Sequence, residues 1–155
     1  MATPAKRFLQ RLESYERAFN RLDELVTHFS GEESQTLFSL EESGLQRDIA
    51  REALIKRFEF TQELSWNLLK DFLQYQGVND LTGSRDVYRR ALSLGLTDTP
   101  EWLDMIQDRN LSAHDYNDTK AKQIVERIIH IYHPLFRKLR ATMKGKAADI
   151  PSTER

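Results

Sequence analysis

The sequence predicts an all-α protein: an up-and-down bundle of four long or medium helices with one extra short helix. Apolar residues recur at helical spacing over most of the chain, and the alternating pattern of a strand does not appear. Charged residues make up 30% of the chain, whereas only 6 of its 155 residues are glycine and 4 are proline, which is typical of a helical bundle. Short connections between the expected helices favour antiparallel neighbours.

The two longest expected helices come first in the chain. Over residues 6–29, apolar side chains alternate steps of four and three, which places them on one face of a helix. That face carries Phe8, Leu12, Tyr15, Phe19, Leu22, Val26 and Phe29. Gly31 is expected to end this helix. The second helix, over residues 46–76, is apolar on several faces, so we expect it to lie centrally or to supply an interface.

Two shorter helices are expected after the second helix. The first covers residues 85–94, and Ser84 is expected to cap its N-terminus. The next covers residues 100–111, with proline in its first turn and with Thr97 or Asp98 as its cap.

The last expected helix covers residues 119–143. Its core stripe consists of Ile124, Ile128, Ile131, Leu135 and Leu139. One bundle domain is therefore expected over residues 1–143. Residues 144–155 are polar, and we expect them to form a disordered tail.

The composition excludes several classes of function. The absence of cysteine excludes disulfides, thiolate catalysis and cysteine–zinc sites. No apolar run approaches the roughly 18 residues that span a bilayer, so we expect a soluble, cytoplasmic protein without membrane contact. A phosphate-binding loop and a zinc-protease motif are missing, and no Asp-x-Asp pair follows Gly83 and Ser84, so nucleotidyl transfer by this chain is not expected. Neither a cofactor nor a metal is expected. The net charge of −1 provides no general attraction for nucleic acid, so RNA would need a local site or a surface made by assembly.

The residues best suited to chemistry lie in segment 108–117, between two expected helices. Arg109 offers a fixed fork of donors for a phosphate, and His114 can exchange a proton near neutral pH. Five positions apart on one continuous helix, these two would point about 140° apart, but a break near Ser112 would let them converge. Together they suffice for RNA cleavage without a metal, since a base can activate the 2′-hydroxyl while a cation stabilises the phosphate.

Simpler interpretations of the same residues stay open at this point. Arg109 could pair with Asp108 or Asp115, and His114 could cap a helix end. His130 and His133 are three positions apart, a spacing that can bind a metal, but no further ligand is evident beside them.

Three segments together resemble the nucleotidyltransferase-substrate-binding family, a branch of the HEPN superfamily. The first is residues 55–66, Ile-Lys-Arg-Phe-Glu-Phe-Thr-Gln-Glu-Leu-Ser-Trp. The second is Ser84-Arg85-Asp86-Val87 leading to Ala91 and Gly95, and the third is Trp102-Leu103-Asp104-Met105 followed by residues 108–116, Asp-Arg-Asn-Leu-Ser-Ala-His-Asp-Tyr. The resemblance extends over about residues 6–139.

The resemblance implies an asymmetric, HEPN-like bundle that forms a homodimer. It also implies a partner, a cognate minimal nucleotidyltransferase usually encoded next door. In one view of the family the bundle is the substrate-binding subunit of that enzyme. In the other view the pair is a type VII toxin–antitoxin system, in which the bundle is a ribonuclease toxin and the nucleotidyltransferase is the antitoxin.

The ribonuclease motif of the superfamily is an arginine followed, after four to six residues, by a histidine, with a tyrosine two positions later in the toxin branch. Arg109, His114 and Tyr116 match it. By resemblance, Arg109 and His114 are catalytic, Asn110 supports them, and Tyr116 accepts AMP from the partner. Glu59 and Glu63 of the first segment are expected to face the pair and orient it, although a salt bridge on the helix surface is the simpler interpretation.

Three functions compete on this basis. The first is a metal-independent endoribonuclease toxin, silenced by adenylylation of Tyr116, with tRNA and mRNA both open as targets. The second is a non-catalytic subunit that presents substrate to the nucleotidyltransferase. The third is a structural dimer that stabilises its partner. The intact motif favours the first function, whereas the near-neutral charge favours the other two.

Overall fold

The computed structural model describes residues 2–30, 44–114 and 118–155, and this part of the chain is helical without a strand. The elements are α1 (Pro4–Ser30), α3 (Gly44–Tyr75), α4 (Ser84–Ser93), α5 (Glu101–His114), α6 (Asp118–Arg127), a π-helical turn (Ile128–Tyr132), α7 (His133–Ala148) and a short 3-10 turn (Ser152–Glu154). The all-α prediction is confirmed. Gly31, the expected end of the first helix, lies outside the described residues.

Helix α1 buries the apolar face that its sequence spacing predicts. All seven residues of the predicted stripe are at most 7% exposed. Each large apolar side chain buried in this way contributes about 2 kcal/mol through removal from water. Tyr15 also donates a hydrogen bond of 2.6 Å from its hydroxyl to the carbonyl oxygen of Phe136, which ties α1 to α7.

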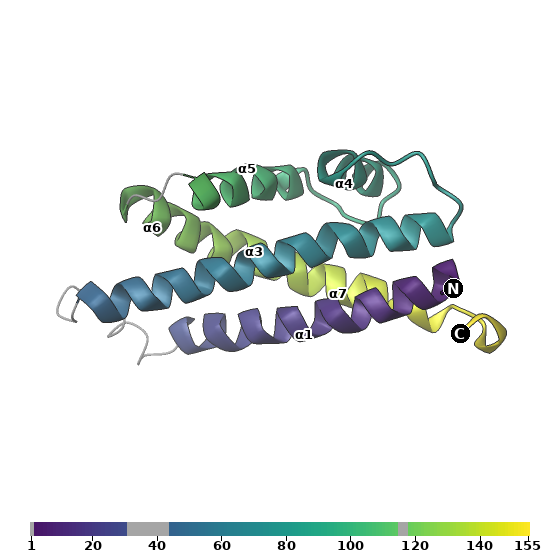
Figure 1. Cartoon of the computed structure of the whole chain (residues 1–155), viewed down its shortest axis with the longest axis horizontal. Helices are drawn as coiled ribbons and strands as arrows, with labels where there is room; N and C mark the ends of the chain where they lie inside the picture. The colour runs from purple at the N-terminus through teal and green to yellow at the C-terminus, as the bar shows by residue number, and fades with distance from the viewer. Residues whose placement is uncertain (1, 31–43, 115–117) are drawn as a thin grey trace.

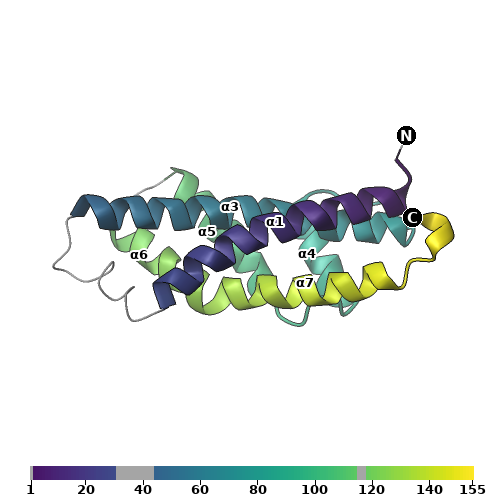
Figure 2. The ribbon, with the colours of Figure 1, turned by 90° about the horizontal axis from the view of Figure 1, so that it is seen from below.

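Helix α3 is the central element of the bundle. It contacts α1, α4, α5, α6 and α7, which explains why its sequence is apolar on several faces. Figures 1 and 2 show α1, α3 and α7 running along the length of the molecule, with the shorter α4 and α5 on one side of α3. The central position expected for residues 46–76 is thus observed, and it makes α3 the frame on which the α5 residues are placed.

The last helix differs from the single helix that we expected. A π-helical turn at Ile128–Tyr132 separates α6 from α7, and the N–H of His133 bonds to the carbonyl of Ile128. Pro134 follows at the start of α7. A proline has no N–H and its ring clashes with the carbonyl four residues earlier, so a regular α-helix cannot continue through it unchanged, and a wider turn relieves the clash.

The π-helical turn also changes which residues form the core of this segment. The buried positions step by four twice, from Ile128 to Tyr132 to Phe136, whereas the expected stripe members Ile131 and Leu135 are only half-buried. The prediction is therefore wrong for these two positions, which lie in and just after the wider turn, whereas Leu139 of the same stripe is 2% exposed as expected.

The expected helix caps are wrong at two places. Gly83, with φ of 103°, precedes α4, and no side chain caps that helix end. Asp86 instead accepts a hydrogen bond of 3.0 Å from the N–H of Thr82. For α5, the hydroxyl of Thr99 accepts the N–H of Glu101 at 3.3 Å, so neither Thr97 nor Asp98 is the cap.

The C-terminal segment is folded, contrary to the expected tail over residues 144–155. Helix α7 continues to Ala148, and Ile150 is only 3% exposed. Arg155 donates hydrogen bonds to the carbonyls of Ala147 and Ile150, at 2.9 and 3.2 Å. The segment is polar on average, but one apolar side chain and one arginine suffice to fold it onto the end of the bundle.

Candidate active site

Arg109 on α5 and Glu63 on α3 form an ion pair at the surface. Arg109 Nη2 and Glu63 Oε2 are 3.8 Å apart, and the two side chains are 39% and 47% exposed. A pair this exposed adds little stability. It does hold a planar guanidinium, whose donors suit a phosphate, where a ligand from solvent can reach it. The expected contact of Glu63 with Arg109 is therefore present.

A buried carboxylate beneath this pair fixes α5 to the last helix. Asp108 is 5% exposed. It accepts two hydrogen bonds from Arg127, from Nε to Oδ2 at 2.6 Å and from Nη2 to Oδ1 at 2.7 Å, and a third from the hydroxyl of Tyr132. The bidentate geometry and the third donor satisfy the buried charge. The alternative in which Arg109 pairs with Asp108 is thus wrong, because Arg127 holds that carboxylate.

The same network shifts two pKa values. Burial first, and then the carboxylate of Asp108, raise the pKa of Tyr132 well above its ordinary value. The hydrogen bond with Asp108 raises the pKa of Arg127. Tyr132 therefore stays a neutral hydrogen-bond donor and Arg127 stays charged over the physiological range.

A second polar cluster lies in the core between α3 and α4. The amide nitrogen of Gln62 donates to the hydroxyl of Tyr88 at 3.0 Å, and the Ser65 and Tyr88 hydroxyls are 2.7 Å apart. Burial raises the pKa of Tyr88, which keeps its proton. Trp102 of α5 packs on this ring, with centroids 5.4 Å apart. Since Gln62 and Ser65 flank Glu63 in sequence, the cluster fixes α4 and α5 against the turn of α3 that carries Glu63.

The remaining predicted site residues are placed unequally. Glu59 lies one turn before Glu63 on α3 and is half-buried, and Asn110 follows Arg109 on α5 and is exposed. His114 is the last residue of α5, and its side chain lies outside what the structure describes. Tyr116 lies outside the described residues. The structure therefore brings together Arg109 and Glu63, while the roles expected for all of these residues stay predictions.

Helix α5 has no break at Ser112. It is continuous from Glu101 to His114, so the break that would let Arg109 and His114 converge is absent. One chain alone was expected to bring Arg109 and His114 together only if the helix broke near Ser112, and this condition is not met.

The other histidines have separate positions. His133 is buried between α1 and α7, where its Nε2 lies 2.7 Å from Asp23 Oδ1 and its ring stacks on Phe19. His130 is exposed. Over residues 2–30, 44–114 and 118–155, no three metal-ligating side chains gather at one place.

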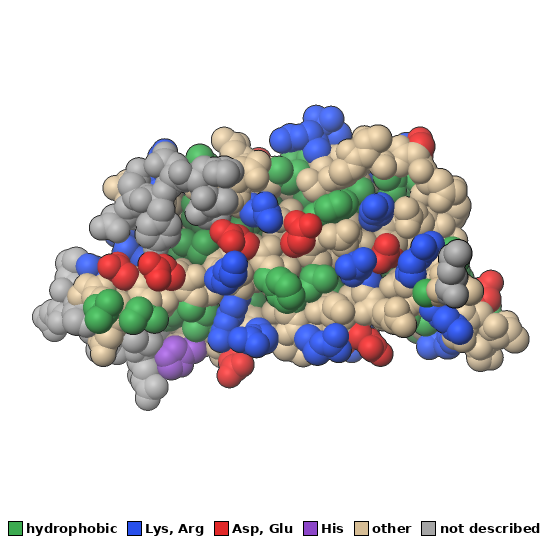
Figure 3. All heavy atoms as spheres, viewed as in Figure 1, with side chains coloured by type: hydrophobic (Ala, Val, Ile, Leu, Met, Phe, Trp, Pro, Cys, Tyr) green, Lys and Arg blue, Asp and Glu red, His purple; other side chains and the backbone are tan. Residues whose placement is uncertain are grey.

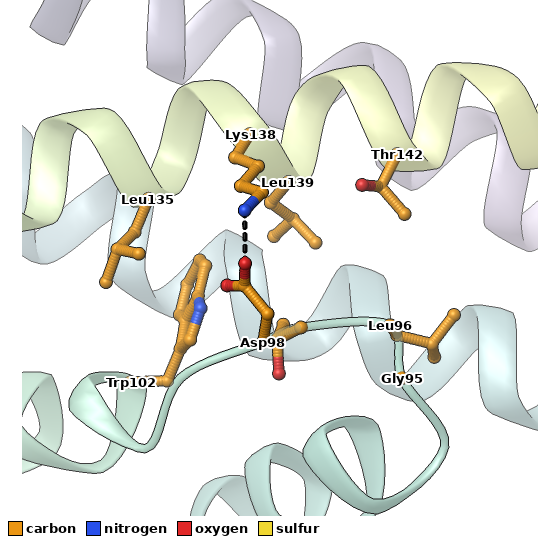
Figure 4. Close-up of a pocket in the computed structure, with 9 residues that line it drawn as sticks. Gly95, Leu96, Asp98, Trp102, Leu135, Lys138, Leu139 and Thr142 are labelled. Carbon is orange, nitrogen blue, oxygen red and sulfur yellow. Dashed lines mark hydrogen bonds and ion pairs between the residues drawn. The ribbon is translucent and has the colours of Figure 1, made fainter.

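One cavity lies away from these residues, between the α4–α5 connection and α7. It has a volume of about 260 Å³ and is lined by Leu96, Trp102, Leu135 and Leu139 together with polar groups. An ion pair between Asp98 and Lys138 crosses it, as Figure 4 shows. No predicted site residue lines it, so the candidate active site is an open surface rather than this cavity.

Sequence interpretation missed Asp108, Arg127 and Tyr132. One signal was available: an aspartate in the motif segment is followed by an arginine and a tyrosine on the next helix, but side chains that far apart reveal their contact only in the fold.

In the described part of the chain, no helix is long and apolar enough to cross a membrane.

The fold and the site together define a helical bundle that presents an arginine–carboxylate pair at its surface. A family model described as nucleotidyltransferase substrate binding protein like matches residues 10–145. The chain belongs to this family. The resemblance of its three segments to the nucleotidyltransferase-substrate-binding branch is thereby confirmed.

Individual relatives agree with this assignment. A Haemophilus influenzae protein described as probable ribonuclease HepT is 31% identical over 116 residues, which are 72% of this chain and 77% of that protein. A solved structure from the same species, described as the substrate binding domain of a nucleotidyltransferase, has a TM-score of 0.74 at 28% identity and covers 86% of this chain and 98% of its own. A Thermus thermophilus structure covers the same shares, with a TM-score of 0.60 at 28% identity.

Proposed function

We propose that this protein is a HEPN toxin, a metal-independent endoribonuclease of a type VII toxin–antitoxin pair. The observation that carries the proposal is the exposed Arg109–Glu63 pair, fixed from below by the buried Asp108. It places a guanidinium at the surface, where it can stabilise charge on a phosphate in a transition state. The relative described as a probable ribonuclease supports the same reaction.

The reaction assigned to the site is transfer within one RNA strand. His114 removes the proton from a 2′-hydroxyl, and that oxygen attacks the adjacent phosphorus. The bond from phosphorus to the 5′-oxygen breaks, and the departing oxygen takes up a proton. Arg109 stabilises the negative charge on the phosphate oxygens, while Glu63 orients Arg109. A homodimer would supply the second histidine as the acid.

The cognate minimal nucleotidyltransferase would act as the antitoxin by attaching AMP to Tyr116. Tyr116 is seven positions after Arg109 in the motif segment. A negative phosphodiester and a bulky nucleoside near the guanidinium would compete with RNA for it. The modification would therefore silence cleavage without unfolding the bundle.

A second candidate is the non-catalytic substrate-binding subunit of a two-component nucleotidyltransferase. The family description and the Haemophilus influenzae structure with 0.74 TM-score both favour it. In that function the Arg109 guanidinium would hold a phosphate of the substrate of the partner enzyme and would cleave nothing.

Growth of a host that expresses the chain separates the two candidates. We expect wild type to arrest growth, Arg109→Ala to lose the arrest, and the nucleotidyltransferase to relieve it. Tyr116→Phe should arrest growth even with the partner present. Arg90→Ala is the matched control, since Arg90 is also a half-exposed arginine paired with a carboxylate, at 3.3 Å from Asp80; it should behave as wild type.

Arrest by Arg109→Ala at equal expression would contradict a role for the motif. The absence of arrest with every variant, combined with co-purification of the two proteins, would favour the substrate-binding subunit. Relief of Tyr116→Phe by the partner would count against Tyr116 as the modified residue.

A further inference from the structure

A groove between α1 and α3 exposes an aromatic ring among cationic side chains. Phe60 is 61% exposed, although phenylalanine is normally buried. It lines the groove together with Ala18, Arg21, Lys56 and Arg57. Figure 3, seen from the side of α1 and α3, shows apolar side chains over the middle of these helices, with Lys and Arg side chains and also Asp and Glu side chains around them.

The charge of the groove has one sign. Arg21, Lys56 and Arg57 are cationic, and no acidic side chain lines it. Arg57 donates a hydrogen bond of 2.6 Å from Nη1 to the carbonyl oxygen of Arg21, which anchors its guanidinium across the two helices. Within the described part of the chain, none of these three cations takes part in an ion pair. The groove therefore has positive charge available for an anionic partner.

An aromatic face surrounded by cations fits a nucleotide better than it fits a second copy of this chain. Bases of single-stranded nucleic acid stack on aromatic rings while cations hold the phosphates. A symmetric contact of two copies centred on this groove would instead bring three cations against three cations. Charge complementarity thus favours a polyanion.

The groove borders the candidate active site. Phe60 and Glu63 are three positions apart on α3, so their Cβ atoms are about 5–6 Å apart. Glu63 in turn contacts Arg109. A strand that runs from the groove toward α5 would therefore meet the cations of the groove at one end and the Arg109 guanidinium, paired with Glu63, at the other.

We propose that this groove binds a nucleotide of single-stranded RNA, with its base on Phe60 and its phosphates held by Arg21 and Lys56, next to the nucleotides at Arg109. This inference rests on the proposed ribonuclease function and names its substrate class. The strand would be read by stacking, which tolerates every base, so selectivity would favour unpaired RNA over duplex.

Binding is measured by fluorescence anisotropy with a labelled, single-stranded 2′-O-methyl RNA, which carries no 2′-hydroxyl and cannot be cleaved. We expect Phe60→Ala to weaken binding about tenfold and Phe60→Tyr to keep it. Arg21→Ala and Lys56→Ala should each lower the slope of log affinity against log salt by about one. Leu94→Ala is the matched control, because Leu94 is a large apolar residue, 53% exposed, outside the groove.

The outcomes separate this inference from the proposed function. Equal affinities of wild type, Phe60→Ala and Leu94→Ala would overturn the groove while cleavage of unmodified RNA could still depend on Arg109. No binding of RNA by wild type would overturn the groove and weigh against the ribonuclease as well. A change of oligomeric state in Phe60→Ala, measured by light scattering, would overturn the inference by assigning the groove to an interface between copies.

Discussion

Two neighbouring residues in the motif segment differ in role because one faces the core and the other faces solvent. Asp108 points into the bundle and is satisfied by Arg127 and Tyr132, whereas Arg109, one position later, lies half-exposed against Glu63. Successive helical positions differ by 100°, so one turn can anchor itself with the first residue and present the second. The turn of α5 that presents the Arg109 guanidinium is thus anchored to the last helix by the buried carboxylate of Asp108.

Asp108→Asn should reveal how much the buried network contributes to stability. The amide keeps the shape of the carboxylate but loses its charge and turns one acceptor into a donor that faces Arg127. We expect the free energy of unfolding to fall by about 2–3 kcal/mol, measured by urea denaturation. Asp104→Asn on the exposed face of α5 is the control and should change it by less than about 0.5 kcal/mol. Equal midpoints for the two variants would show that the network adds no stability.

At the scale of the helices, α1 and α7 are joined by polar contacts to Asp23 beside the aromatic ring of Phe19. His133 lies 2.7 Å from Asp23, stacks on Phe19, and has Arg137 of the same helix beside Asp23. Burial first, and then the positive charge of Arg137, lower the pKa of His133, against the opposing effect of Asp23. Although burial acts in the other direction, hydrogen bonds from His133 and Arg137 hold the pKa of Asp23 below its ordinary value.

Both shifts make the contact between α1 and α7 sensitive to acid. A histidine whose pKa is lowered by folding binds fewer protons in the folded than in the unfolded state, so stability is lost as the pH falls from about 6.5 toward the folded pKa. We expect the free energy of unfolding to decline between about pH 7 and pH 5, and His133→Gln to reduce that decline. His130→Gln, at an exposed position, should follow wild type. Parallel pH profiles for all three proteins would exclude His133 as the source.

Helix periodicity predicted the elements well where one stripe faces one core. Helix α1 is the clearest case, since every apolar residue of its stripe is buried. The same rule failed at Ile131 and Leu135, where a π-helical turn before Pro134 changes the winding, although Leu139 further along is buried as predicted. Periodicity assumes a constant 3.6 residues per turn, so it cannot register a local change of winding unless the proline is weighed with it.

For the whole molecule, contacts between distant segments were the part that sequence could not supply. The motif singled out Arg109, and resemblance added Glu63, but the partners of Asp108 come from the last helix. The exposed Phe60 and its cations were hidden for the same reason, since they come from α1 and α3 together. The chemical properties of single residues can be predicted from the sequence, whereas a surface that two helices form together can be recognised only in the folded structure.

The C-terminal segment tests how far the folded molecule extends. Ile150 is 3% exposed. The hydroxyl of Tyr75, at the end of α3, donates a hydrogen bond of 2.8 Å to the carboxylate of Glu154. Because truncating a buried isoleucine removes apolar contacts and leaves a cavity, Ile150→Ala should lower the free energy of unfolding by about 2 kcal/mol.

Ile49→Ala is the matched comparison for that variant, since the same side chain is removed from a position that is 55% exposed, and its effect should stay within about 0.5 kcal/mol. Urea denaturation of the full chain measures both. If the two variants unfold at the same midpoint, residues 149–155 do not stabilise the bundle and the polar composition of this segment would describe it better than its contacts do. A clear difference would mean that residues 149–155 close the bundle where α1 begins and α3 ends, away from the motif segment. Removal of these residues should then weaken folding and leave the site around Arg109 unchanged.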